Sequence, residues 1–227
     1  MQNNHPEDFL DSSDKLLAYE YSIRGGEFSF IAGVDEAGRG CLAGPVVAAA
    51  VIFTDLNRVP AGINDSKALS PEKREFLRAR IIAEPSVKWA VAEVSAEEID
   101  RSDILRATWN AMRLAVEQLI PPAQFVLVDG NPVRGFPLPS ENIIKGDANS
   151  ASIAAASILA KTHRDALMEK YDLEYPGYGF AVHKGYGTAH HLEALNKLGV
   201  TPIHRTTFEP VRLILHPPEY TQQDLIF

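Results

Sequence analysis

The chain has 227 residues, 45% of them hydrophobic, and a formal net charge of −8 at pH 7. This composition suits a single globular domain, and the longest uncharged apolar run, residues 43–53, is far shorter than the roughly 18–20 residues that span a bilayer. Residues 1–30 and 217–227 hold eight of the 30 acids but only two of the 22 bases. The remaining chain is therefore nearly neutral, which excludes a broad basic surface but permits a local phosphate site.

The chain opens with a polar, acidic segment. Residues 1–28 are expected to form an N-terminal extension in which only residues 15–24 are helical. A globular domain over residues 29–216 follows. It begins with a strand at residues 30–34, a glycine-rich turn, and a largely buried strand at residues 46–53.

Helices and strands alternate through the rest of the chain. Ser70 followed by Pro71 marks a helix start. Ser95 and Glu98 have the spacing of a capping box, and the helical region that they open can break near Ser102. The remaining expected elements are strands at residues 87–94 and 125–128, helices at residues 150–171 and 188–198, and a C-terminal tail at residues 217–227. The order predicts an α/β fold with a mixed central sheet flanked by helices.

Acidic residues stand at the ends of two predicted strands. Asp35 and Glu36 end the first strand, and Asp129 ends the strand at residues 125–128. Open α/β sheets bind ligands at such strand ends, and converging carboxylates repel one another until a cation neutralises them. Hard oxygen ligands favour Mg²⁺ or Mn²⁺ over zinc. The alternative is that each aspartate only caps a turn.

The pair Asp35–Glu36 poses a geometric question. Neighbouring strand residues point to opposite faces of a sheet, so both side chains cannot reach one ion from a regular strand. Either the strand ends or bulges at the pair, or one residue contributes through its backbone carbonyl.

Several segments occur together in one order. They are Val34-Asp35-Glu36-Ala37-Gly38-Arg39-Gly40 with Gly44-Pro45, Asn64-Asp65-Ser66-Lys67, Val128-Asp129-Gly130, Lys145-Gly146-Asp147, Ala155-Ala156-Ser157-Ile158-Leu159-Ala160-Lys161, Arg164-Asp165, His183-Lys184-Gly185-Tyr186-Gly187-Thr188 and His204-Arg205. This set resembles type 2 ribonuclease H, in its bacterial form ribonuclease HII, over roughly residues 30–212. The resemblance implies a ribonuclease H-like fold and an endonuclease that cuts the RNA of RNA–DNA hybrids and single ribonucleotides embedded in duplex DNA.

The resemblance also implies a catalytic site. Its metal-binding carboxylates correspond to Asp35, Glu36, Asp129 and Asp147, which would hold two Mg²⁺ or Mn²⁺ ions roughly 4 Å apart and leave 3′-hydroxyl and 5′-phosphate ends. Two alternatives concern the fourth ligand. Asp147 could instead cap the helix that begins near residue 150, and Asp165 could take its place.

Substrate contacts are implied in the same way. The turn Gly38-Arg39-Gly40 would contact the ribose 2′-hydroxyl through its backbone, since glycine permits close approach, and Tyr186 would pack on the neighbouring deoxyribose. Three lysines would contact phosphates: Lys67, Lys145 and Lys184. The alternatives are that Tyr186 is packed core and that Arg39 pairs with Glu36 at the surface.

Other sequence features support further expectations. The terminal residues Gln223-Asp224-Leu225-Ile226-Phe227 are similar to peptides that bind the DNA sliding clamp, although such a tail can also fold back on its own core. The lone Cys41 is expected to be a small buried residue in a cytoplasmic protein, and His190 and His191 are expected at the surface. We expect a monomer without membrane contact.

Rival functions remain. A dinucleotide-binding site is rejected, because Pro45 and a β-branched run follow Gly38-x-Gly40 where that motif requires a helix. Another carboxylate-dependent metal phosphoesterase is the enzymatic alternative. A non-catalytic hybrid-binding protein is the other, although a cluster of acids would weaken its affinity for phosphates.

Overall fold

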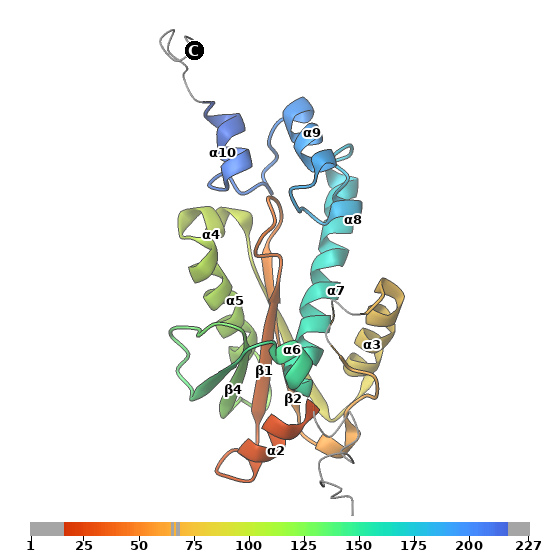
Figure 1. Cartoon of the computed structure of the whole chain (residues 1–227), viewed down its shortest axis with the longest axis vertical. Coiled ribbons are helices and arrows are strands. Elements are labelled where there is room, and N and C mark those ends of the chain that lie inside the picture. The colour runs from red at the N-terminus through yellow and green to blue at the C-terminus, as the bar shows by residue number, and fades with distance from the viewer. Residues whose placement is uncertain (1–15, 65, 67–68, 218–227) are drawn as a thin grey trace, which may run out of the picture. The chain divides into compact units, whose positions relative to one another are not determined.

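The computed structural model describes residues 16–64, 66 and 69–217 (Figure 1). Lys67 and the terminal residues 223–227, both assigned functions above, lie outside this range. The chain divides into two compact units that alternate along the sequence. Of the described residues, the first unit holds 16–37, 47–64, 66, 69–93 and 108–163, and the second holds 38–46, 94–107 and 164–217.

The elements follow one another as strands and helices. In chain order they are α2 (Ala18–Arg24), β1 (Ile31–Ala37), β2 (Val46–Phe53), the 3-10 turn Leu56–Arg58, α3 (Pro71–Ala83), β3 (Val87–Val94), α4 (Ala96–Arg101), α5 (Ile104–Glu117), β4 (Phe125–Asp129), β5 (Ser140–Ile143), α6 (Gly146–Asn149), α7 (Ala151–Glu174), α8 (Phe180–His183), α9 (Ala189–Leu198) and α10 (Glu209–Leu215).

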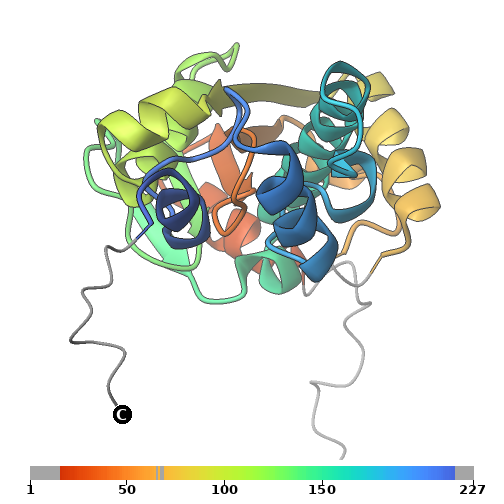
Figure 2. The ribbon, with the colours of Figure 1, turned by 90° about the horizontal axis from the view of Figure 1, so that it is seen from above.

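The first unit is built on a five-stranded sheet with the order β3-β2-β1-β4-β5. Strand β1 pairs antiparallel with β2 and parallel with β4, and β4 pairs parallel with β5. Figures 1 and 2 show α5 on one side of β1 and β2, with α3 and α7 on the other. The predicted α/β fold with a mixed sheet flanked by helices is confirmed.

Close packing explains the small residues of this unit. All eight residues of β2 are buried, as expected for a strand covered on both faces. The alanine- and serine-rich start of α7 lies directly against β1 at Gly33. A Cβ atom there would lie 2.3 Å from the backbone nitrogen of Ile153 and from the carbonyl carbon of Ser152. Only glycine permits this approach.

Helix starts match the predicted capping residues. The Ser70 hydroxyl accepts a hydrogen bond from the Lys73 backbone N–H. Ser95 and Glu98 form the predicted capping box. The predicted break is also confirmed, because α4 ends at Arg101 and α5 begins at Ile104.

The second unit packs α8, α9, α10 and the end of α7 around residues 38–46. Figure 2 shows this connection, in orange, between α9 and α10. The buried cluster of the unit centres on the aromatic residues Tyr178 and Phe180 and on Met168. The sequence did not predict the short elements β5, α6, α8 and α10. Within the described residues, no helix is long and apolar enough to cross a membrane.

Candidate active site

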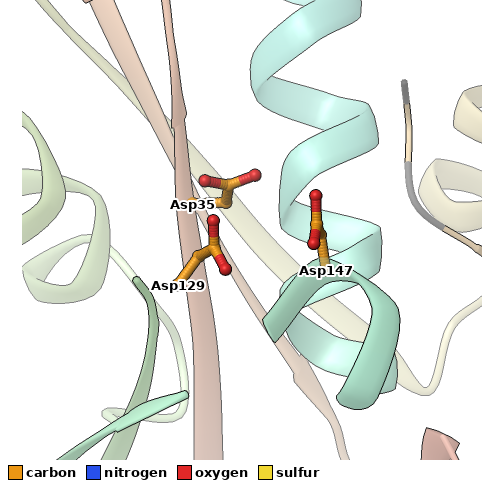
Figure 3. Close-up of side chains that lie close together, drawn as sticks. All are labelled: Asp35, Asp129 and Asp147. Carbon is orange, nitrogen blue, oxygen red and sulfur yellow. The ribbon is translucent and has the colours of Figure 1, made fainter. Parts of the chain in front are cut away.

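Three aspartates of the first unit converge on one space (Figure 3). Asp35 comes from β1, Asp129 from the end of the neighbouring parallel strand β4, and Asp147 from α6. Each offers one carboxylate oxygen, and these oxygens all lie within 4.8 Å of one another. Asp35 and Asp147 are buried and Asp129 is half-buried. We call these three residues the carboxylate cluster.

The electrostatics of the cluster favour a cation. Burial raises the pKa of Asp35 well above its usual range, and the charges of Glu36 and Asp129 raise it further. The ionised form of Asp35 is therefore disfavoured by its surroundings. A divalent ion would remove this repulsion, and three close carboxylate oxygens are the ligand type that Mg²⁺ and Mn²⁺ prefer. The residues present fit such an ion.

Glu36 stands apart from the three aspartates. The pairing of β1 with β2 continues regularly from Ala32 to Ala37, so the expectation that the strand could end or bulge at Asp35–Glu36 is wrong. Because the strand is regular, the two side chains point to opposite faces. The backbone N–H of Glu36 donates to Asp35 Oδ1 over 2.7 Å. Of the two alternatives from the sequence, a contribution of Glu36 through its backbone carbonyl is the one that fits a regular strand.

Hydrogen bonds fix the aspartates from behind. The backbone N–H of Gly146 donates to Asp129 Oδ1 over 2.6 Å. Ser157 of α7 hydrogen-bonds to Asp35, and its hydroxyl lies 2.7 Å from the hydroxyl of buried Ser66. Sequence reasoning included Ser66 and Ser157 only as parts of motifs and gave neither a role. Ser66 and Ser157 are 91 residues apart in the chain, so local sequence patterns do not reveal that their side chains meet.

Asp147 and Asp165, the two alternatives for the fourth metal-binding carboxylate, lie in different places. Asp147 lies within the short helix α6, and its side chain faces Asp35 and Asp129. Asp165 lies in the middle of α7 in the second unit and is not one of the three clustered acids. Its neighbour Arg164 donates to the backbone carbonyls of Pro45, Ala43 and Lys184.

In the second unit, buried Arg205 holds the glycine turn Gly38–Gly40, and buried Arg164 lies against this turn at Gly38. Arg205 is fully buried and donates to the carbonyls of Gly38, Arg39 and Gly44 over 2.7–3.1 Å. Burial lowers the pKa of Arg205 to about 10, so it stays charged at neutral pH. Gly38 has a φ of 93°, and a Cβ atom there would meet the Arg164 side chain. The turn therefore requires glycine.

The loop that carries Tyr186 lies against the residues that follow this turn. The Leu42 backbone N–H donates to the Gly185 carbonyl over 2.8 Å. Tyr186 is 46% exposed, so it is not the packed core residue of the alternative reading. Burial of part of its ring raises the pKa of its hydroxyl, and the nearby Cys41 thiol raises it further. Cys41 itself is buried, as predicted.

Of the three lysines expected to contact phosphates, Lys145 and Lys184 are described by the structure, and they differ in exposure and in pairing. Lys145 is exposed and has a left-handed backbone, with a φ of 54°. Lys184 forms an ion pair with Glu169, with an Nζ–Oε1 distance of 2.7 Å. Lys145 is therefore the more accessible cation for a phosphate.

The expectation that His191 lies at the surface is wrong, because it is fully buried. Its Nε2 lies 3.1 Å from Nε2 of His204, and its Nδ1 lies 2.9 Å from the Tyr186 carbonyl. Since the Thr201 backbone N–H donates to Nδ1 of His204, one set of neutral tautomers satisfies the chain from Thr201 to Tyr186. The polar residues around His191 in the sequence predicted an exposed side chain. Its hydrogen-bond partner His204, which lies 13 residues further along the chain, allows it to be buried.

Comparisons with known proteins agree on one family. The family model described as Ribonuclease HII matches residues 32–211. The chain is 52% identical over 206 residues to a protein named Ribonuclease HII from Geobacillus kaustophilus, covering 91% of this chain and 78% of that one.

Solved structures give the same picture. The ribonuclease H2 of Pyrococcus horikoshii superposes with a TM-score of 0.72 at 29% identity, covering 82% of this chain and 96% of that one. The ribonuclease HII of Archaeoglobus fulgidus, solved in complex with PCNA, superposes with a TM-score of 0.67 at 26% identity, covering 86% and 99%. The predicted ribonuclease H-like fold is thereby confirmed.

Proposed function

Because the chain belongs to the ribonuclease HII family and is therefore a metal-dependent ribonuclease H, we propose that it cuts both the RNA strand of RNA–DNA hybrids and DNA at single embedded ribonucleotides. The proposed reaction is phosphodiester hydrolysis assisted by two divalent ions, and it leaves 3′-hydroxyl and 5′-phosphate ends. Manganese and magnesium are the proposed ions.

The carboxylate cluster is the observation that carries this proposal. Asp35, Asp129 and Asp147 offer oxygens within 4.8 Å of one another, and they would hold the ions. Bound ions would activate water and stabilise the charge that develops on the scissile phosphate. Glu36 would add its backbone carbonyl. Its position on the regular strand β1 supports an indirect role rather than a shared side-chain site.

The glycine turn supports recognition of RNA. Arg205 fixes the carbonyls of Gly38 and Arg39, which holds the backbone of this turn ready to contact a 2′-hydroxyl, the group that distinguishes ribose from deoxyribose. Tyr186 is exposed on the adjacent loop and would pack on the deoxyribose that follows. Lys145 and Lys184 would contact phosphates, and Lys67 is proposed for the same task on sequence grounds.

A substrate panel tests the function. Three duplexes of one sequence are compared in Mn²⁺ and in Mg²⁺: all DNA, DNA with one central ribonucleotide, and an RNA–DNA hybrid. The proposal predicts cleavage of the second and third and none of the first, with product ends that a polymerase extends without prior phosphatase treatment. Cleavage of the all-DNA duplex at a comparable rate would instead favour another carboxylate-dependent phosphoesterase. A wild-type protein that binds hybrids without cutting them would favour the non-catalytic alternative.

We also propose that the tail at residues 223–227 binds a DNA sliding clamp. The support is its sequence and the solved complex of the Archaeoglobus fulgidus ribonuclease HII with PCNA. Deleting residues 222–227 should abolish pull-down by the clamp and leave hybrid cleavage intact. Unchanged pull-down would refute the clamp proposal alone. The monomeric state and the cytoplasmic location stay predictions.

A further inference from the structure

A glutamate of the N-terminal segment is buried in the first unit. Glu20 of α2 is 2% exposed. Its Oε1 accepts hydrogen bonds from the Ser150 hydroxyl over 2.7 Å, the Ser152 hydroxyl over 2.6 Å and the Ser152 backbone N–H over 2.9 Å. A carboxylate buried this deeply is unfavourable unless it is hydrogen-bonded. These three bonds therefore fix the position of Glu20 against residues 150–152.

The residues that Glu20 holds join α6 to α7. The first N–H groups of a helix lack partners within the helix and favour negative charge, so the start of α7 suits the carboxylate of Glu20. Ser150 ends α6, and its backbone N–H donates to the Gly146 carbonyl over 2.8 Å. Asp147 lies inside this four-residue helix.

The same segment contacts Asp129 and the strand that carries Asp35. The backbone N–H of Gly146 donates to Asp129. At Gly33, two residues before Asp35, residues 152 and 153 lie so close to β1 that a Cβ atom would be 2.3 Å from their backbone atoms. A shift of this junction would therefore move Asp147 relative to both Asp35 and Asp129.

We propose that Glu20 is a positioning residue for the metal-binding carboxylates: it holds the α6–α7 junction so that Asp147 faces Asp35 and Asp129. This inference rests on the proposed metal site. Glu20 lies outside residues 32–211, which the family model matches. Part of the segment predicted to be an extension thus serves the site.

A purely structural role makes a different prediction. If Glu20 only capped α7, its loss would lower the melting temperature but leave the affinity of the folded protein for metal unchanged. Metal affinity, measured well below the melting temperature, separates the two roles.

The test uses the full chain and the electron paramagnetic resonance signal of free Mn²⁺. We expect Glu20→Ala to raise the Mn²⁺ dissociation constant roughly 10-fold, the lower range for loss of a residue that supports metal ligands. Glu20→Gln keeps an acceptor oxygen and should restore part of the affinity. Glu27→Ala removes an exposed acid of the same segment and should stay within about twofold of wild type.

Asp129→Asn is the reference for the metal site itself. Wild-type affinity in a folded Glu20→Ala protein, together with a large loss in Asp129→Asn, would overturn the role of Glu20 alone. Unchanged affinity in Asp129→Asn would overturn the proposed metal site. If Glu20→Ala does not fold, Ser152→Ala and Glu20→Gln decide, and wild-type affinity in both overturns the inference.

Discussion

The two units bury charge in opposite ways. In the first unit, three carboxylates face one another, and burial, followed by the charges of Glu36 and Asp129, raises the pKa of Asp35. In the second unit, the guanidinium groups of Arg164 and Arg205 donate to backbone carbonyls. Burial alone therefore does not identify a reactive site. A buried charge whose hydrogen-bond partners are backbone carbonyls holds a structure, whereas several like charges that face one another favour the binding of an external cation.

The strongest way to test this contrast is Asp129→Asn. The substitution removes one proposed ligand, so cleavage of DNA with one ribonucleotide should fall on the order of 10³-fold while hybrid binding is retained. Because one repelling charge is gone, the melting temperature in EDTA should stay equal or rise. Rates are measured in Mn²⁺ under single turnover. A large loss of stability without metal would show that Asp129 holds the fold instead.

Arg205→Ala should have the reverse effect, chiefly on stability. It leaves the carbonyls of Gly38, Arg39 and Gly44 without their donor, and breaking such a buried interaction costs about 3–5 kcal/mol in the free energy of unfolding. Urea unfolding measures the change. Arg101→Ala, an exposed arginine of the same unit, is the matched control and should cost less than about 0.5 kcal/mol. Equal losses in the two variants would refute the role of Arg205.

Acid should destabilise the second unit through His204. Burial, together with the neighbouring His191 and His183, lowers the pKa of His204 to about 4. The unfolded chain has a histidine pKa near 6.5, so it binds more protons between these values. Neutral His204 therefore contributes on the order of 3 kcal/mol to the free energy of unfolding. This contribution is complete above pH 6.5 and is lost as the pH falls to about 4.

Urea unfolding of wild type and His204→Asn across pH 4 to 7 measures this contribution. Asparagine offers an acceptor in place of Nδ1 but does not titrate, so the variant should depend less on pH. The raised pKa of Asp35 acts in the opposite direction, but it does so equally in both proteins and therefore does not affect their difference. Parallel pH profiles of the two proteins would contradict the role of His204.

The smallest expected effect concerns an exposed charge. Lys145→Asn removes the cation but preserves a left-handed backbone, which asparagine tolerates. We expect KM for the hybrid to rise about threefold, kcat to stay unchanged, and the slope of log affinity against log salt to fall by about one. Steady-state kinetics at several salt concentrations measure both. An unchanged salt slope would exclude a phosphate contact at Lys145.

The sequence predicted the features that depend on local pattern. Strands β2 and β3 have the predicted bounds, and the caps at Ser70 and Ser95 are in place, because apolar runs and capping residues act over a few positions. Asp35 and Asp129 were identified because acids directly after an apolar run are unusual, although β1 continues past Asp35 to Ala37. The α/β class followed from the order of the elements.

Features that depend on distant partners were missed. Glu20 resembles a surface acid until Ser152, 132 residues away, is placed beside it. Arg205 and His191 are polar residues, yet both are buried and hold the structure through hydrogen bonds. The partner of Arg205 at Gly38 is 167 residues away in the chain. Strand β5 is short and partly exposed, so its pairing with β4 rather than its own pattern defines it.

The central claim is that the carboxylate cluster exists to bind divalent cations. The most direct measurement is the anomalous scattering of Mn²⁺ in crystals of the wild-type protein. The account predicts a peak at about 2.0–2.6 Å from a carboxylate oxygen of Asp35, Asp129 and Asp147, and loss of that peak in Asp129→Asn. Manganese bound only elsewhere, with these three side chains unliganded, would contradict it.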